Sequence, residues 1–201
     1  MGLIIVPEIR EVLYHVALTG YPSCGKSEIG NVLSRRAGYR HVSTDMIRDE
    51  LLGGKSVFEL TKEDWDLLFS EFQTRKHLYL HDGKNVATDN CPLTNDERRV
   101  TMHVSPLFKE YLHERNGRLM RYLVVLDTRM EELARRNEQR GRTGEASYNM
   151  LKWLKGRWEE PPAVIADDSG EVPVLRYENN TPRDQQLVLK DLETRLGVTL
   201  L

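Results

Sequence analysis

The chain has 201 residues, of which 39% are hydrophobic and 30% are charged, and its formal net charge is -2. This length fits one domain spanning residues 1–201, and the ordinary globular composition excludes disordered, fibrous and collagen-like proteins. The charge balance argues against a protein that coats nucleic acid through many phosphates, although an enzyme touching only a strand end needs few such contacts.

Membrane and disulfide signatures are missing from the sequence. No apolar run approaches the roughly 20 residues needed to cross a bilayer, and the first residues lack the basic region of a signal peptide. The two cysteines, Cys24 and Cys91, have neither metal-ligand spacing nor a disulfide framework. We therefore expect a reducing, intracellular (cytoplasmic) location and no membrane partner, whereas the sequence indicates no oligomeric state.

Short β-branched or apolar runs alternate along the chain with segments of helical periodicity. Apolar residues predict a helix around Ile29, another over Trp65–Phe72, and a third from Val100 to Tyr111. Such alternation indicates a parallel sheet with helices on both faces, in which ligands bind beyond the carboxyl ends of the strands. The predicted strands are Tyr14–Thr19, Arg40–Ser43, Asn85–Thr88, Arg121–Leu126 and Val172–Tyr177.

Three helix starts resemble capping boxes, in which a threonine side chain and an acidic residue three positions later satisfy free backbone amides. The pairs are Thr61 with Asp64, Thr94 with Glu97, and Thr128 with Glu131.

The first strand runs directly into Gly20-Tyr-Pro-Ser-Cys-Gly-Lys-Ser27, which matches the P-loop pattern G-x-x-x-x-G-K-[ST] at every defined position. Glycines let the backbone wrap so that successive amides point at phosphate oxygens, and the following helix adds the positive end of its dipole. We expect ATP or another nucleoside triphosphate, with Mg²⁺ on the Ser27 hydroxyl. Cys24 would contribute backbone rather than thiol chemistry. The predicted nucleotide-binding residues of the loop are Gly20, Ser23, Cys24, Gly25, Lys26 and Ser27.

The second strand ends in Ser43-Thr-Asp45-Met-Ile-Arg48. A carboxylate at this strand end would face the phosphate loop, where Asp45 can take the proton from an attacking hydroxyl. Arg48 can hold an anionic acceptor by a two-pronged contact. The alternative is that Asp45 only caps the helix Met46–Leu52.

Two further carboxylates follow predicted strands. Asp89 would hold a metal-bound water, orient Arg48 or contact the acceptor, and its alternative is a turn-forming cap. Asp127 ends a Walker-B-like apolar run, but the helix start expected immediately after it favours a structural role over metal binding.

An arginine-rich helix predicts a lid over residues 136–158. Arg136 and Arg140 lie four positions apart and share one face, the helix breaks at Gly141 and Gly144, and a second helix follows through Leu151. A mobile arm of this kind can bring guanidinium groups over a transferring phosphate, with Lys26, Asp45 and Arg140 as catalytic residues. The alternative is a solvated surface helix.

Together these segments resemble the kinase module of bacteriophage-type 5′-hydroxyl polynucleotide kinases, from Tyr14 to Pro161. The phosphate loop is generic. The D-x-x-R spacing of Asp45 and Arg48, the string Asn95-Asp-Glu-Arg-Arg99 after Asp89, and Arg136-Asn-Glu-Gln-Arg-Gly141 are more particular. The phosphatase domain common in that family is missing, and the acidic pair Asp49-Glu50 follows Arg48.

The resemblance implies an α/β P-loop NTPase fold of adenylate-kinase type: a three-layer sandwich with a mostly parallel five-stranded sheet and a helical lid. It also implies Asp45 as general base, Arg48 on the acceptor phosphate and Arg140 on the donor phosphates. The expected substrate is then the 5′-end of a nucleic acid. Two alternatives stay open: a kinase for a small hydroxylated metabolite such as a sugar acid, nucleoside or antibiotic, and a non-catalytic nucleotide-binding module.

Overall fold

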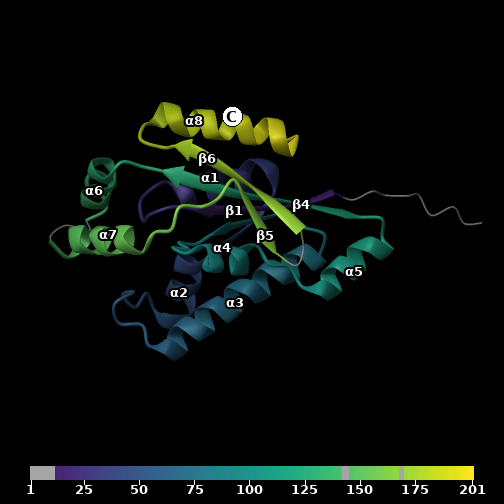
Figure 1. Cartoon of the computed structure of the whole chain (residues 1–201), viewed down its shortest axis with the longest axis horizontal. Coiled ribbons are helices and arrows are strands. Elements are labelled where there is room, and N and C mark those ends of the chain that lie inside the picture. Colours follow the sequence, from purple (N-terminus) through teal and green to yellow (C-terminus); the bar gives the residue numbers. More distant parts are fainter. Residues whose placement is uncertain (1–11, 142–144, 168–169) are drawn as a thin grey trace, which may run out of the picture.

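The computed structural model describes residues 12–141, 145–167 and 170–201, whose elements build a twisted sheet between two layers of helices (Figure 1). Of the positions discussed above, Gly144 lies outside the described residues. The described strands form one six-stranded sheet in the order β2-β3-β1-β4-β6-β5. Their bounds are β1 Val12–Thr19, β2 Arg40–Ser43, β3 Val86–Asp89, β4 Arg118–Asp127, β5 Val164–Asp167 and β6 Gly170–Glu178.

The central strand β1 is parallel to both of its neighbours, β3 and β4. Val16, Ala17 and Leu18 are completely buried because helices cover both faces of the sheet. The P-loop kinase type of α/β fold expected from the sequence is confirmed by this architecture. All five predicted strands are present.

The helices lie on both sides of the sheet (Figure 1). Side chains of α1, α6, α7 and α8 share one apolar cluster with β1 and β4, while α3 and α5 pack with the start of β1 on the opposite face. No helix in the described ranges combines the length and apolar composition needed to span a membrane. The helix bounds are α1 Lys26–Ala37, α2 Thr44–Leu52, α3 Lys62–His81, α4 Asn95–Met102, α5 Pro106–Glu114, α6 Met130–Gln139, α7 Glu145–Arg157 and α8 Pro182–Leu196.

The structure corrects the predicted number of strands. A sixth strand, β5, pairs antiparallel with β6 at the edge of the sheet. It has only four residues, Val164-Ile-Ala-Asp167, of which only Ile165 is fully buried. A short edge strand of this kind is fixed by its pairing with β6 rather than by a pattern in its own sequence.

The predicted helix from Val100 to Tyr111 is wrong, because two helices occupy this stretch. Helix α4 ends at Met102, and α5 begins at Pro106, which occupies the first helical turn. Proline lacks an amide hydrogen and clashes with the preceding turn, so it starts a helix readily and does not continue one. The apolar spacing continued across the break and concealed it.

Two of the three predicted capping boxes are confirmed, at Thr61 with Asp64 and at Thr94 with Glu97. The third is wrong: α6 begins after Arg129, without a side-chain cap. Thr128 instead donates its hydroxyl hydrogen to the carbonyl oxygen of Asn179 at 3.2 Å. A tertiary contact has replaced the local one.

Helix α1 approaches β2 closely at Gly30. A methyl group at this position would lie 2.4 Å from Nε2 of His41, well inside van der Waals contact. His41 is itself held over the helix, with Nδ1 lying 3.3 Å from Oδ1 of Asn31. The glycine therefore sets the distance between α1 and the strand beside β3.

We expect Gly30→Ala to lower the free energy of unfolding by about 1–2 kcal/mol, because overpacking outweighs the gain in helix propensity. Gly156→Ala is the matched control, since Gly156 lies in α7 at a position where an added methyl group would meet only open space. It should leave stability unchanged or raise it by up to about 1 kcal/mol. Urea unfolding of both variants measures the difference, and equal stabilities would contradict the close approach.

Candidate active site

The loop Gly20–Ser27 lies between the end of β1 and the start of α1. Three of its residues have a positive backbone φ: Gly20 (φ 143°), Ser23 (φ 67°) and Gly25 (φ 98°). Turns of this kind aim successive amides into one concave surface that binds anions, and the amino end of α1 adds its partial positive charge. The geometry is that of a phosphate cradle.

Lys26 lies inside this loop. Its Nζ donates to the carbonyl oxygens of Gly20 at 3.0 Å and Tyr21 at 3.1 Å. Burial disfavours the ammonium, but the surrounding groups, Cys24 and Asp89 foremost, hold the pKa of Lys26 above its ordinary value. The side chain therefore carries a positive charge at neutral pH, as a phosphate ligand requires.

Ser27, the last residue of the loop, contacts Asp89 at the end of β3. Ser27 Oγ donates to Asp89 Oδ2 at 2.5 Å, and His41 Nε2 lies 3.8 Å from the same oxygen. Burial opposes the charge on Asp89, but His41, Lys26 and Ser27 outweigh it and hold the pKa of the carboxyl below its ordinary value. A hydroxyl beside an ionised carboxylate is the hard oxygen donor set that Mg²⁺ prefers, so these residues fit that ion.

Asp45 and Arg48 form a pair on the first turns of α2. Arg48 Nη1 lies 3.1 Å from Asp45 Oδ1, and its Nη2 lies 3.6 Å from Asp49 Oδ1. The side chain of Asp45 is 62% exposed and that of Arg48 only 14%. The structure does not support the capping alternative, because Ser43 holds the N-cap position of α2 and Asp45 lies inside the helix.

The phosphate loop, α2, β3 and the end of α6 surround one cleft, of about 50 Å³. Of the predicted residues, the structure therefore brings together four loop residues, both aspartates and Arg140. Gly20, Cys24, Arg48 and Arg136 are not among the lining residues. The lining residues are Pro22, Ser23, Gly25, Lys26, Ser27, Asp45, Asp89 and Arg140. A larger hollow of about 550 Å³ lies at the start of β4 and contains none of the predicted residues.

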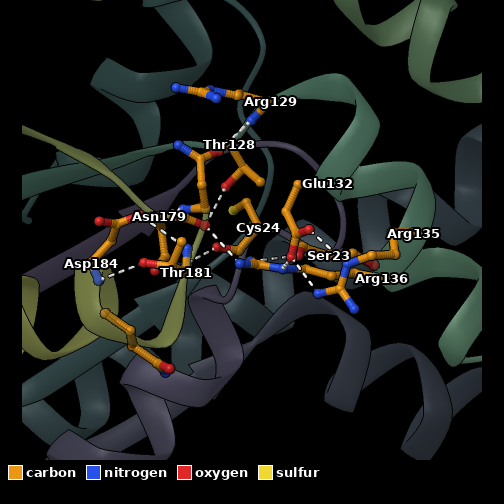
Figure 2. A network of polar contacts seen from close by, with 12 residues as sticks. Ser23, Cys24, Thr128, Arg129, Glu132, Arg135, Arg136, Asn179, Thr181 and Asp184 are labelled. Carbon is orange, nitrogen blue, oxygen red and sulfur yellow. Dashed lines mark hydrogen bonds and ion pairs between the residues drawn. The ribbon is translucent and has the colours of Figure 1, made fainter.

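Arg136 and Arg140, the two arginines predicted for a lid, differ in their surroundings. Arg140 lines the cleft, with Nη1 3.5 Å from Ser23 Oγ and Nη2 3.4 Å from Glu28 Oε1. Arg136 is not among the lining residues. It donates to Glu132 Oε1 at 2.6 Å, to the carbonyl oxygen of Asn179 at 2.8 Å and to that of Ser23 at 3.4 Å (Figure 2).

Sequence reasoning missed Asn179, which follows β6. Its Nδ2 donates to the carbonyl oxygen of Cys24 at 2.6 Å, 155 residues away in the chain (Figure 2). No local pattern marks an asparagine for such a role, because the contact arises only when β6 joins the sheet. His41 was missed for the same reason, although its place two residues before the end of β2 is a usable signal.

Asp127 lies at the end of β4, outside the cleft lining. Its Oδ2 accepts from Nη2 of Arg176 on β6 at 2.9 Å. The ion pair supports the structural role that the sequence favoured for this residue. The acidic strand end beside the phosphate loop is that of β3, where Asp89 stands.

The protein-family model AAA_18, described as an AAA domain, matches residues 16–151. This match covers more than half of the 201 residues, and the chain therefore belongs to that family. A comparison with curated proteins found no match.

Solved structures with the same fold include several kinases. A sugar kinase from Janibacter sp. HTCC2649 is 18% identical, with 93% of this chain and 96% of that chain covered and a TM-score of 0.61. A fungal RNA kinase is 15% identical, with 92% and 88% covered and a TM-score of 0.59. The APS kinase CysC of Mycobacterium tuberculosis, in complex with AMPPNP and APS, is 15% identical, with 92% and 98% covered and a TM-score of 0.57. At these identities the likeness establishes the fold alone.

We expect Lys26→Ala to weaken binding of a magnesium–ATP analogue at least about 100-fold, because it removes the buried cation beside the phosphates. Titration calorimetry measures the dissociation constant. Lys84→Ala removes an exposed lysine and is the control. Undiminished affinity in Lys26→Ala would show that the nucleotide binds elsewhere.

Proposed function

We propose that this member of the AAA-domain family transfers the terminal phosphoryl group of ATP, or of another nucleoside triphosphate, to the 5′-hydroxyl of a polynucleotide. One observation carries the proposal: the exposed carboxylate of Asp45 lines the same cleft as Lys26 and Ser27. Arg48 Nη1 lies 3.1 Å from Oδ1 of that carboxylate. Asp45, the proposed base, thus shares a cleft with the phosphate loop, and a cation lies beside it. This is the arrangement that transfer to a hydroxyl requires.

The donor side of the cleft is the phosphate loop. Its amides and the ammonium of Lys26 would hold the triphosphate in place. Ser27 and Asp89 would hold Mg²⁺, which when bound neutralises charge on the phosphate oxygens. We therefore place Asp89 on the metal rather than on the acceptor, because its carboxylate already receives the Ser27 hydroxyl at 2.5 Å.

The acceptor side begins at α2. Asp45 is accessible to an incoming hydroxyl and can remove its proton as the oxygen attacks. Arg48 would turn from Asp45 and Asp49 toward the phosphate that follows the terminal nucleoside. Since one guanidinium contact of this kind needs no extended basic surface, a net charge of -2 is compatible with a strand end as substrate.

The lid contributes the remaining positive charge. Arg140 already lines the cleft and would neutralise charge that spreads over the phosphoryl oxygens during transfer, together with Lys26. Arg136 remains a candidate for the donor phosphates, although it would first have to leave its partners Glu132 and Asn179.

A kinase for a small hydroxylated metabolite is the second candidate. Two observations favour it. The cleft is small, and two carboxylates lie on its acceptor side, Asp45 in the cleft lining and Asp49 beside Arg48, where a phosphodiester backbone would be repelled. Against it stands the D-x-x-R pairing of Asp45 with Arg48, which suits an acceptor that carries a phosphate.

The acceptor is tested directly by incubating the protein with γ-labelled ATP and Mg²⁺. We expect label on 5′-hydroxyl DNA or RNA oligonucleotides and none on the same oligonucleotides with a 5′-phosphate. Sugars, sugar acids and nucleosides form the parallel arm. Label on a metabolite alone would replace this proposal by the second candidate, and ATP binding without transfer to any acceptor would reject both.

Asp45→Asn should reduce kcat by about 100-fold or more while leaving the dissociation constant of the ATP analogue within about twofold, because only the proton acceptor is lost. Asp66→Asn, which changes an exposed carboxylate on α3, is the control. Retained turnover in Asp45→Asn would move the general base to another residue, with Asp89 next.

Arg48→Ala should raise the KM of the 5′-hydroxyl oligonucleotide at least about tenfold while changing that of ATP little, because a charged hydrogen bond to the acceptor is removed. Steady-state kinetics with each substrate varied in turn separates the two constants. Arg183→Ala, at an exposed position of α8, should change neither. An equal rise in both constants would mean that Arg48 only shapes the cleft.

A further inference from the structure

Ser23, the fourth residue of the phosphate loop, has an unusual backbone. Its φ is 67°, and with Asn116 it is one of two described residues other than glycine with a positive φ. This left-handed conformation is disfavoured for residues with a side chain and persists where neighbouring groups impose it. The positive-φ pair Ser23 and Gly25 belongs to the turn that aims the loop amides inward.

The side chain that holds Ser23 is that of Asn137 on α6, the first helix of the proposed lid. Ser23 Oγ donates to Oδ1 of Asn137 at 2.6 Å, across 114 residues of sequence, and both side chains are buried. Asn137 is only 1% exposed, which is unusual for an asparagine in a helix rich in arginine and glutamate. The bond is therefore largely buried.

The backbone carbonyl groups of Ser23 and Cys24 also have hydrogen-bond partners. The carbonyl oxygen of Cys24 accepts from Asn179, and Arg136 joins the carbonyl oxygens of Ser23 and Asn179 (Figure 2). A methyl group on Gly25 would lie 2.5 Å from Asn179 Nδ2, so the packing is tight. These contacts leave the Ser23 hydroxyl with Asn137 as its close partner.

We propose that Asn137 is a positioning residue for nucleotide binding: by accepting the Ser23 hydroxyl it fixes the left-handed turn of the loop before the triphosphate arrives. A loop already in its binding conformation loses less conformational entropy on binding, so the effect falls on nucleotide affinity. The inference rests on the donor half of the proposed function, binding of a triphosphate by this loop, and is independent of the acceptor.

Asn137 belongs to α6, the helix that also carries Arg136 and leads to Arg140. The bond between Ser23 and Asn137 therefore also holds α6 against the phosphate loop. Arg140 Nη1 lies 3.5 Å from the Ser23 hydroxyl that Asn137 accepts. A purely structural asparagine would stabilise α6 without affecting the phosphates. Nucleotide affinity and folding stability therefore have to be measured separately.

The experiment is a double-mutant cycle with Ser23→Ala, Asn137→Leu and the double variant, using AMP-PNP with Mg²⁺ in titration calorimetry. Each single variant should weaken binding about tenfold, and the double variant no more than either one, because all three lack the same hydrogen bond. Gln139→Leu makes the same amide-to-apolar change at an exposed position of α6 and should bind normally.

Affinities that multiply in the double variant, or unchanged affinity in Ser23→Ala and Asn137→Leu with lowered thermal midpoints, would overturn the inference. If Asn137→Leu does not fold, Ser23→Ala and Ser23→Gly carry the test. Both lack the hydroxyl, but glycine adopts the left-handed conformation freely, so alanine should bind more weakly than glycine. Equal, undiminished binding in both would reject the role of Asn137. Because no acceptor is present, failure of oligonucleotide labelling would leave these results unaffected.

Discussion

Asn179 donates to the carbonyl oxygen of Cys24 at 2.6 Å, and this bond ties the end of β6 to the loop at the end of β1. The loop must satisfy two demands at once: its amides have to face the cleft, and its outward carbonyl oxygens need partners because they are buried. Asn179 and Arg136 meet the second demand from outside. Gly25 permits the close approach, since any side chain there would collide with Asn179. Because the carbonyl oxygens of Ser23 and Cys24 are hydrogen-bonded to Arg136 and Asn179, the loop can keep its amides turned toward the cleft.

The strand order then determines which charges meet. Because β3 lies directly beside β1, Leu18 and Asp89 are paired in register, and Asp89 reaches Ser27 at the start of α1. Strand β2 comes next, so the turn into α2 places Asp45 at the same edge. Strand β4 lies on the other side of β1, and its final residue, Asp127, pairs with Arg176 on β6. Two similar strand-end carboxylates thus acquire different surroundings from the positions of their strands in the sheet.

The sequence was sufficient wherever the signal is local. The phosphate loop, the five predicted strands and the capping boxes at Thr61 and Thr94 depend on residues within a few positions of one another. It failed where distant contacts decide: Thr128 bonds to Asn179 rather than to its own helix, and β5 exists only because β6 is beside it. The break before Pro106 was readable, since proline at that position opposes a continuous helix. Asn179 and His41 carry no local signal of comparable strength.

The electrostatics of the cleft follow from what is buried. Asp89 is nearly inaccessible and remains ionised because Lys26, His41 and Ser27 surround it. Asp45 is open to solvent, which suits the proton-accepting role proposed for it. Two carboxylates at one edge of a sheet would repel each other if both were buried without cations. Burying one beside Lys26 and exposing the other beside Arg48 removes that conflict, and the difference agrees with the metal-holding role proposed for Asp89 and the proton-accepting role proposed for Asp45.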